Sequence, residues 1–194
     1  DFKVAGFWMV LLLAGSSFFY VTTKEKEGNT SKLNASVVEQ YRRLADLGEA
    51  DVESPYKIHM ATEKFMDAPI RITVFSDFQC PFCKVVAEQM PELIRRYSKH
   101  MNVQYMFYPL DNACNSNIKG RFHEHACQAA YVAACDEKKF VEVHDEIFAG
   151  QDKLGDDFLV GLAKKHGLTN CSDDAIKNKV ITAINQGTKY NLKS

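Results

Sequence analysis

The sequence predicts an α/β domain, in which two strands flank a long helix and a block of helices follows. The apolar run Ile70–Phe75 leads directly into a stretch with helical periodicity, and Val103–Tyr108 alternates as a further strand would. Beyond them, helical patterns separated by glycines continue to about residue 187. With 194 residues, 46% hydrophobic and 25% charged, the chain is long enough for one domain with an appendage.

The N-terminal segment predicts a membrane anchor. No charge occurs from Val4 to Thr23, which is about the length that a helix needs to cross a bilayer. A cleaved signal peptide is the alternative, but apolar sequence continues after the small residues 14–17, where cleavage would fall. We therefore expect residues 1–23 to be an uncleaved transmembrane helix, or the last helix of an upstream membrane domain. The flanking charges do not decide its orientation.

The predicted elements follow in order. Residues 24–54 form a linker, polar at first and with a short helix over 34–47. Residues 55–194 form the folded domain, with strands at Tyr56–Met60, Ile70–Phe75 and Val103–Tyr108. A long helix runs from about 81 to 99, where Pro91 would kink it. Helices near 120–135, 138–149, 155–166 and 172–187 make up a helical insertion over about 111–187.

Two cysteines, Cys80 and Cys83, stand where the apolar strand gives way to the long helix. The first sulfur then lies at a helix N-terminus, where unpaired N–H groups and the helix dipole favour a thiolate. The thiolate is the form that attacks a disulfide, and Cys83 lies one turn further along the same face. Pro81 suits the first helical position, because its missing N–H would be unpaired there. The pattern predicts a redox pair.

Two other interpretations of this pair are a structural disulfide and half of a zinc site. Zinc needs two more ligands at a similarly tight spacing, and the chain has no second Cys-x-x-Cys. The six cysteines are many for a reducing cytosol and favour an oxidising compartment, which places residues 24–194 outside the cytoplasm. The net charge of −1 gives no electrostatic case for nucleic-acid binding.

The run from Phe75 to Cys83 resembles the active site of the DsbA-like branch of the thioredoxin superfamily. Further motifs are similar to a membrane-tethered subgroup, some of whose members are fused to a vitamin K epoxide reductase homologue. The motifs shared with this subgroup are Pro109-Leu110-Asp111 with Cys114-Asn115, His123 with His125-Ala126-Cys127, Cys135, and the run Phe140–Phe148. The resemblance as a whole covers roughly residues 56–194.

The resemblance implies a thiol–disulfide oxidoreductase with a thioredoxin-like fold and no bound organic cofactor. Cys80 would be the attacking sulfur and Cys83 its buried partner, while Pro81 and Phe82 would tune the potential. Substrates would be unfolded or partly folded secreted proteins. A membrane quinone reductase, such as a vitamin K epoxide reductase homologue fused upstream, would reoxidise the pair. The domain would then lie in the periplasm or another extracytoplasmic space, held by a single pass through the inner membrane.

Two departures from the superfamily pattern stand out. A cis-proline loop usually faces the Cys-x-x-Cys, but no proline follows Pro109. We therefore expect a chain that is truncated before that loop and the closing strands. The second departure is Val74, which occupies a position where many members hold a buried acid that assists proton transfer.

The other four cysteines, Cys114, Cys127, Cys135 and Cys171, are predicted to form structural disulfides. Three connectivities are open; we favour Cys114 with Cys127 and Cys135 with Cys171, and a second redox-active pair is the alternative. A zinc site at His123, His125 and Cys127 is disfavoured, because on a helix His125 would point about 200° away from His123. We assign His144 and His166 to packing or to the surface.

The sequence thus predicts a dithiol oxidase that acts through Cys80 and Cys83. A disulfide reductase or isomerase on the same scaffold is one alternative, since the direction of exchange depends on the relative stability of thiolate and disulfide. A redox-inert binding domain, in which Cys80 and Cys83 form a permanent bridge, is the other.

Overall fold

The computed structural model describes residues 35–44, 46, 48, 52–190 and 192. The chain divides into two units between Gly48 and Glu49. In the first unit, residues 35–42 are helical, within the range predicted for a short helix, and apolar side chains such as Tyr41 are exposed. The predicted anchor, residues 1–23, lies outside the described residues. Among the helices of the described part, none is long and apolar enough to span a bilayer.

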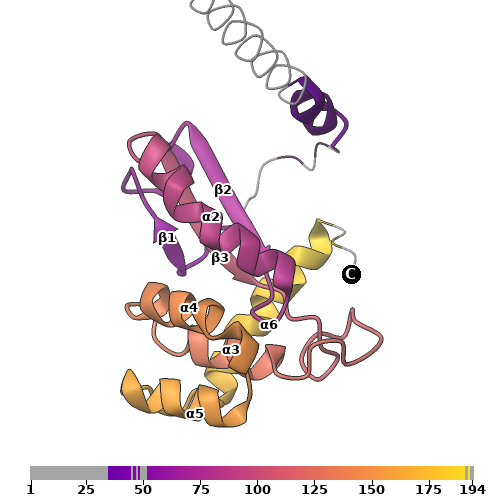
Figure 1. Cartoon of the computed structure of the whole chain (residues 1–194), viewed down its shortest axis with the longest axis vertical. Helices are drawn as coiled ribbons and strands as arrows, with labels where there is room; N and C mark the ends of the chain where they lie inside the picture. Colours follow the sequence, from indigo (N-terminus) through magenta and orange to yellow (C-terminus); the bar gives the residue numbers. More distant parts are fainter. Residues whose placement is uncertain (1–34, 45, 47, 49–51, 191, 193–194) are drawn as a thin grey trace, which may run out of the picture. The chain divides into compact units, whose positions relative to one another are not determined.

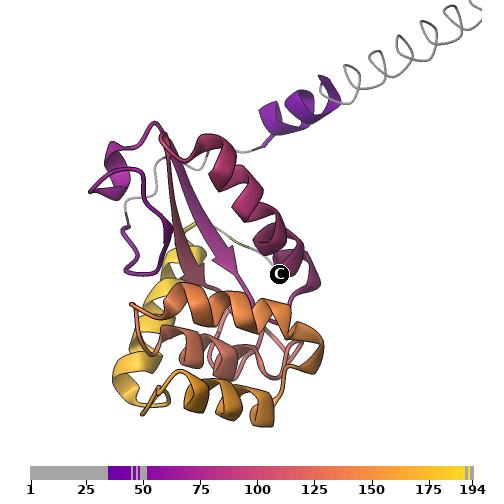
Figure 2. The same cartoon turned by 60° about the vertical axis from the view of Figure 1, so that its left-hand side comes forward.

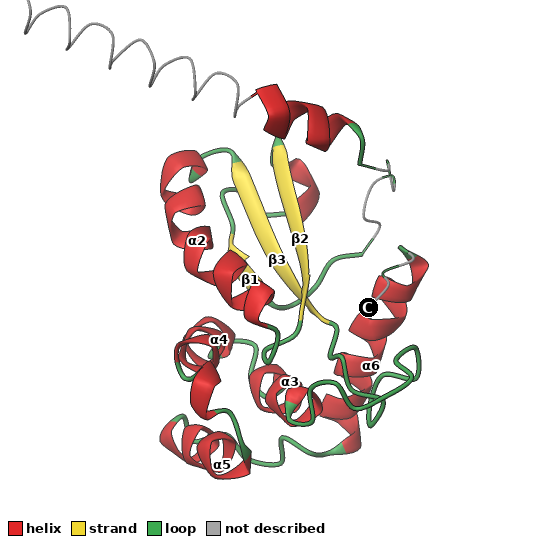
Figure 3. Ribbon diagram, turned by 45° about the vertical axis from the view of Figure 1, so that its right-hand side comes forward, coloured by secondary structure: helices red, strands yellow, loops and turns green. Residues whose placement is uncertain are grey.

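The second unit is built on a three-stranded sheet with the order β1-β3-β2 (Figure 3). Strand β2 (Ile70–Ser76) pairs in parallel with β3 (Met101–Phe107), while β1 (Lys57–His59) pairs with β3 in the antiparallel sense. Every residue of the central strand is buried. All three predicted strands are present, shifted at their ends by one to two residues, and a short 3₁₀ helix, η1 (Phe65–Asp67), precedes β2.

Helix α2 (Pro81–Tyr97) runs alongside the strands and covers one face of the sheet (Figure 2). Its Met90 packs with Met101 and Val103 of β3 in a small apolar cluster. The helix continues through Pro91, in the interior of the predicted range. The connection β2–α2–β3 is therefore the parallel strand–helix–strand unit that the sequence predicted.

The remaining helices gather at one end of the sheet (Figures 1 and 2). They are α3 (Ala126–Ala134), α4 (Phe140–Ala149), α5 (Asp156–Lys165) and α6 (Asp174–Lys189), with a short 3₁₀ helix, η2 (Gln151–Lys153), between α4 and α5. Helix α3 is rich in alanine and almost wholly buried, because it packs against α4, α5 and α6. Small side chains allow these helices to approach α3 on several sides.

Aromatic side chains join the helical block to the sheet. The rings of Tyr105 and Phe107, from β3, pack against Phe140 of α4 at centroid distances of 5.3 and 6.1 Å. At the other side, α6 lies against the ring of Tyr108, so closely that a Cβ at Gly187 would stand 2.5 Å from that ring. The helical insertion and the sheet thus share a single apolar core.

The predicted helix over 120–135 begins later than expected, at Ala126. Residues 121–125 turn back toward the loop after β3 instead: Arg121 pairs with the buried carboxylate of Asp111, and the His123 N–H donates to the carbonyl of Leu110. These tertiary hydrogen bonds compete with the helical pattern and prevail. The prediction that His123 and His125 lie within a helix was therefore wrong.

Candidate active site

Cys80 and Cys83 occupy the first turn of α2. Cys80 is the N-cap residue, with an extended backbone conformation (φ −76°, ψ 121°), and Pro81 follows at the start of the helix. Both cysteines are free thiols and half-buried, whereas Phe82 between them is 82% exposed. The predicted placement at a strand-to-helix junction is confirmed. An N-cap sulfur next to unpaired helical N–H groups is in a setting that favours the thiolate.

The Cys83 thiol has a raised pKa. Burial raises the pKa of the Cys83 thiol, and the charge of Cys80 acts in the same direction. Hydrogen bonding from the Asp77 backbone and the Ser76 hydroxyl opposes this rise without cancelling it. At neutral pH Cys83 is therefore a protonated thiol, which has to lose its proton before it can attack a sulfur.

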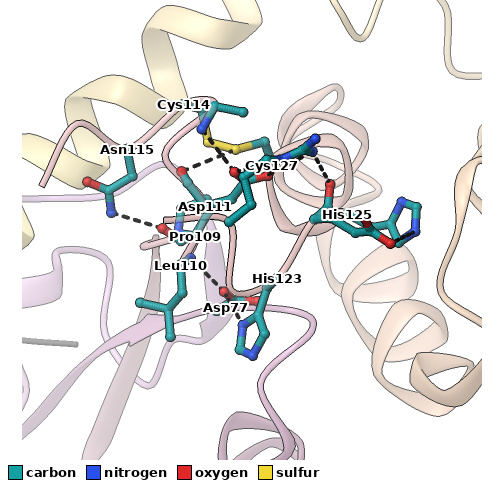
Figure 4. The surroundings of a disulfide bond; sticks show 12 residues. Asp77, Pro109, Leu110, Asp111, Cys114, Asn115, His123, His125 and Cys127 are labelled. Atoms are coloured by element: carbon teal, nitrogen blue, oxygen red, sulfur yellow. Dashed lines mark hydrogen bonds and ion pairs between the residues drawn. A yellow bond between two sulfur atoms is a disulfide. The ribbon is translucent and has the colours of Figure 1, made fainter. Parts of the chain in front are cut away.

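The carboxylate of Asp77 organises the loop that leads into α2. It is buried, and its Oδ1 accepts the Gln79 N–H at 2.6 Å. Its Oδ2 accepts the Leu110 N–H at 2.7 Å and lies 2.9 Å from Nδ1 of His123 (Figure 4). A buried carboxylate needs such partners to offset its desolvation. Asp77 thus joins the loop before Cys80 to the segment after β3.

Two glutamines connect the same loop to the helical insertion, Gln79 from the loop and Gln151 from the insertion. Gln79 accepts the His125 N–H at 2.9 Å. Gln151 Nε2 donates to the carbonyl of Phe78 at 2.7 Å and to that of Cys80 at 3.1 Å. The backbone of Gly150, next to Gln151, packs closely against the ring of Phe158. A Cβ at this position would lie 2.4 Å from that ring. The backbone on both sides of Cys80 is therefore fixed by residues distant in sequence.

A disulfide between Cys114 and Cys127 lies beside this loop (Figure 4). It joins the segment after β3 to the start of α3, and that segment supplies Leu110, His123 and His125. The side-chain amide of Asn115 donates to the carbonyl of Pro109 within the same segment. The second disulfide, Cys135–Cys171, joins the end of α3 to the segment before α6. This is the connectivity favoured from the sequence.

No cluster of His, Cys, Asp and Glu suited to a metal ion occurs among the described residues. His123 and His125 have other partners: His123 contacts Asp77, and His125 Nδ1 lies 3.4 Å from a carboxylate oxygen of Asp156. The ammonium group of Lys84, a nearby charge in the sequence, lies 3.9 Å from a carboxylate oxygen of Asp152.

Residues 71–193 match the family described as the DSBA-like thioredoxin domain. The chain belongs to this family. A curated relative, the Na⁺/H⁺ antiporter NhaA 1 of Mycolicibacterium gilvum, is 30% identical over 90 residues, which are 45% of this chain. The chain spans only 13% of the length of that antiporter.

Solved structures of DsbA-like proteins have the same fold as this DSBA-like domain. A variant of alpha-DsbA1 from Wolbachia pipientis aligns with a TM-score of 0.57 at 17% identity, over 77% of this chain and 76% of its own. ScsC of Proteus mirabilis in a transitional conformation gives 0.54 at 16%, over 86% and 77% of the two chains. A periplasmic thioredoxin-like protein of Salmonella enterica serovar Typhimurium gives 0.53 at 16%, over 78% and 82%.

Several residues of this DSBA-like site were not found by sequence reasoning. Gln151 was missed because a glutamine after a helix carries no periodicity, and His123 was weighed only as a zinc ligand. Asp77 was noted as a nearby charge without a known direction. Its position between an apolar strand and a Cys-x-x-Cys was the available indication of a buried carboxylate, but its partners lie 33 and 46 residues away.

Proposed function

We propose that this protein is a thiol–disulfide oxidoreductase, and that it acts as a dithiol oxidase through Cys80 and Cys83. The observation that carries the proposal is that the two thiols of the pair have different surroundings. Cys80 stands at a helix N-terminus, in a loop held by Asp77, Gln79 and Gln151, and Cys83 is a half-buried thiol of raised pKa. Such a pair separates the attacking sulfur from the resolving one.

In the oxidase direction, a thiolate of the substrate attacks the Cys80 sulfur of the closed pair. The Cys80–Cys83 bond breaks, Cys83 leaves as a thiolate and takes up a proton, and a mixed disulfide joins Cys80 to the substrate. A second substrate thiolate then attacks its own mixed-disulfide sulfur and releases Cys80. The substrate loses two electrons and two protons, and the pair is left as a dithiol.

The proposal includes the surroundings of the domain. The apolar segment 1–23 would anchor it to the inner membrane, with the catalytic domain in an extracytoplasmic space. Two further disulfides in the domain are compatible with an oxidising compartment. Substrates would be unfolded secreted proteins. Reoxidation would come from a membrane quinone reductase, for which a vitamin K epoxide reductase homologue is our candidate.

A redox titration in glutathione buffers tests the direction of exchange. The fraction of closed Cys80–Cys83 pair is measured by thiol trapping and mass spectrometry as the buffer potential is varied. A potential near about −120 mV, at the oxidising end of the known range, would support a donor of disulfides. A potential near about −270 mV would instead indicate a reductase.

Thiol alkylation separates both enzymes from a redox-inert domain. In the reduced protein we expect iodoacetamide to modify Cys80 well before Cys83, because Cys80 is at the helix N-terminus and Cys83 carries the raised pKa. A pair that remains closed throughout the accessible range of buffers, and offers no reactive thiol, would sink the catalytic proposal.

A further inference from the structure

A cavity of about 310 Å³ is lined by Cys83. It lies between α2, the sheet and α4, opens partly to solvent, and has mostly apolar walls. The polar groups in the wall come from four elements: Ser76 of β2, Cys83 and Arg95 of α2, Tyr105 of β3, and His144 with Asp145 of α4. A cavity of this size holds several water molecules, since one needs roughly 10–15 Å³ of such volume.

The hydroxyl of Tyr105 is an unpaired polar group in this wall. The side chain is only 1% exposed, and its oxygen forms no hydrogen bond with the described residues. Burial raises the pKa of both Tyr105 and Cys83, and the nearby Ser76 hydroxyl offsets part of each rise. An unpaired buried hydroxyl is costly, and a cavity that is large enough for water and has other polar groups in its wall offers it a partner.

His144 is a titratable group in the cavity wall, and the exchange steps described above assign it no role. Its ring is buried and packs edge-on against Tyr105, at 5.1 Å between centroids. Its Nδ1 lies 2.8 Å from a carboxylate oxygen of Asp145, whose side chain is 71% exposed. The imidazole therefore connects solvent, through Asp145, with the inside of the cavity. The other charged or titratable groups in the wall are Cys83 and Arg95 of α2.

Val74 also lines the cavity, so no carboxylate from β2 can serve Cys83 there. We propose that His144 exchanges the proton of Cys83 through water in this cavity and the hydroxyls of Ser76 and Tyr105. The inference rests on the proposed function and adds to it the route of the proton. Cys83, Ser76, Tyr105 and His144 all line this one cavity, so water in it can bridge the thiol and the imidazole.

An aromatic disulfide oxidises the Cys80–Cys83 dithiol in two steps. Cys80 thiolate attacks one sulfur of the reagent and releases a first thiolate. The S–H bond of Cys83 then breaks, its proton passes along the hydroxyl and water route to the imidazole of His144, and the Cys83 thiolate attacks Cys80. The bond between Cys80 and the reagent breaks, and a second thiolate leaves with its electron pair. In the oxidase direction, the imidazolium returns the proton to the departing Cys83.

The reaction of the reduced protein with limiting dithiobis(nitrobenzoate) separates the two steps. The first coloured thiolate is released with a rate that depends on reagent concentration, and the second with a rate that does not. Because the leaving thiolate needs no proton, the second phase reports deprotonation of Cys83. In His144→Phe, which retains an aromatic ring in an aromatic cluster, we expect the second phase at pH 7 to slow about a hundredfold. The first phase should not change.

Four comparisons make the result decisive. Imidazole in the buffer should restore part of the second phase in His144→Phe, and a carboxylate introduced by Val74→Asp in that background should do the same. Tyr105→Phe should slow the second phase even though it removes an unpaired buried hydroxyl and does not destabilise the fold. His100→Phe, at an exposed position after α2, is the matched control and should behave as the wild type.

The outcomes distinguish the two proposals. Loss of the first phase in the wild-type protein would overturn the assignment of Cys80 and with it the proposed function. A normal first phase, with a second phase whose rate and pH profile are the same in His144→Phe and the wild type, would overturn the proton route alone. If His144→Phe does not fold, Tyr105→Phe decides, and an unchanged second phase in that variant also overturns the route.

Discussion

The six cysteines form two kinds of pair, and the difference lies in what each pair connects. Cys114–Cys127 and Cys135–Cys171 are bonded across 13 and 36 residues and hold separate segments together. Cys80 and Cys83 are free thiols within one turn of α2. A bond between distant segments restricts the unfolded chain and stabilises the fold. A bond within one helical turn restricts almost nothing, so it can open and close without unfolding the domain.

The surroundings of Cys127 and Cys80 also differ. Cys127 is 1% exposed and belongs to the buried helix α3, whereas Cys114 and both cysteines of the second disulfide are half-buried. Cys80 is half-buried at a helix N-terminus, next to the exposed Phe82, and side-chain hydrogen bonds hold the loop around it. Burial of Cys127 shields one sulfur of its disulfide from attacking thiolates, whereas an exchanging pair must be accessible to them.

The largest effect is expected from removing the thiols of the free pair. In Cys80→Ser, exchange with glutathione disulfide should be lost, because a serine hydroxyl does not attack a disulfide under these conditions. In Cys83→Ser, the first step should remain and a mixed disulfide at Cys80 should accumulate, detectable by mass spectrometry. Thermal stability should barely change in either variant. Exchange at full rate in Cys80→Ser would mean that another cysteine is the nucleophile.

Removal of the bonded pairs should affect stability instead. From loop length, we expect the variant with Cys135→Ala and Cys171→Ala to lose about 4 kcal/mol of unfolding free energy in urea, and that with Cys114→Ala and Cys127→Ala about 3 kcal/mol. The second variant should also exchange more slowly, because its loop supplies the partners of Asp77. Equal exchange rates in the two variants would show that the loop does not support the active site.

Gln151 allows a finer test of how the site is held. Gln151→Ala removes two hydrogen bonds, to the carbonyls of Phe78 and Cys80, and should cost about 1–2 kcal/mol. Gln151→Glu should cost more, because a carboxylate would face two carbonyl oxygens that need a donor. The first phase of the thiol reaction should slow in both. Gln89→Ala, at an exposed position of α2, is the control.

The sequence was sufficient where local patterns decide the structure. The apolar run before Cys80, the helical periodicity after it and Pro81 at the first helical position predicted the strand, the helix and the location of the pair. The disulfide connectivity was open among three possibilities, and the favoured one is found.

The sequence was insufficient where contacts between distant residues decide. Residues 121–125 were predicted as helix, yet their hydrogen bonds go to Leu110 and Asp111. His144 was assigned to packing, and its ring does pack among aromatic side chains. Only the fold shows that the same ring also lines a cavity shared with Cys83, since α4 and α2 are far apart in the chain.

Glu146 forms a third kind of connection, an ion pair. Its removal should have the smallest effect on the free energy of unfolding. Glu146 of α4 accepts from Lys165 Nζ at 2.7 Å and contacts His166 Nε2 at 3.0 Å, at the end of α5. Its pKa is lowered, chiefly by the hydrogen bond from Lys165. The Glu146 side chain is 35% exposed, so solvent screens the pair, and Glu146→Gln should cost only about 0.5 kcal/mol at pH 7.

The pH dependence of that small difference follows from the direction of the shift. A carboxylate whose pKa is depressed in the folded state contributes its stability above the unfolded pKa of about 4.3, and loses it as the pH falls through the folded value. Urea unfolding of wild type and Glu146→Gln should therefore give a gap at pH 7 that closes in acid. A gap that persists below the folded pKa would mean that Glu146 connects α4 and α5 by packing rather than by charge.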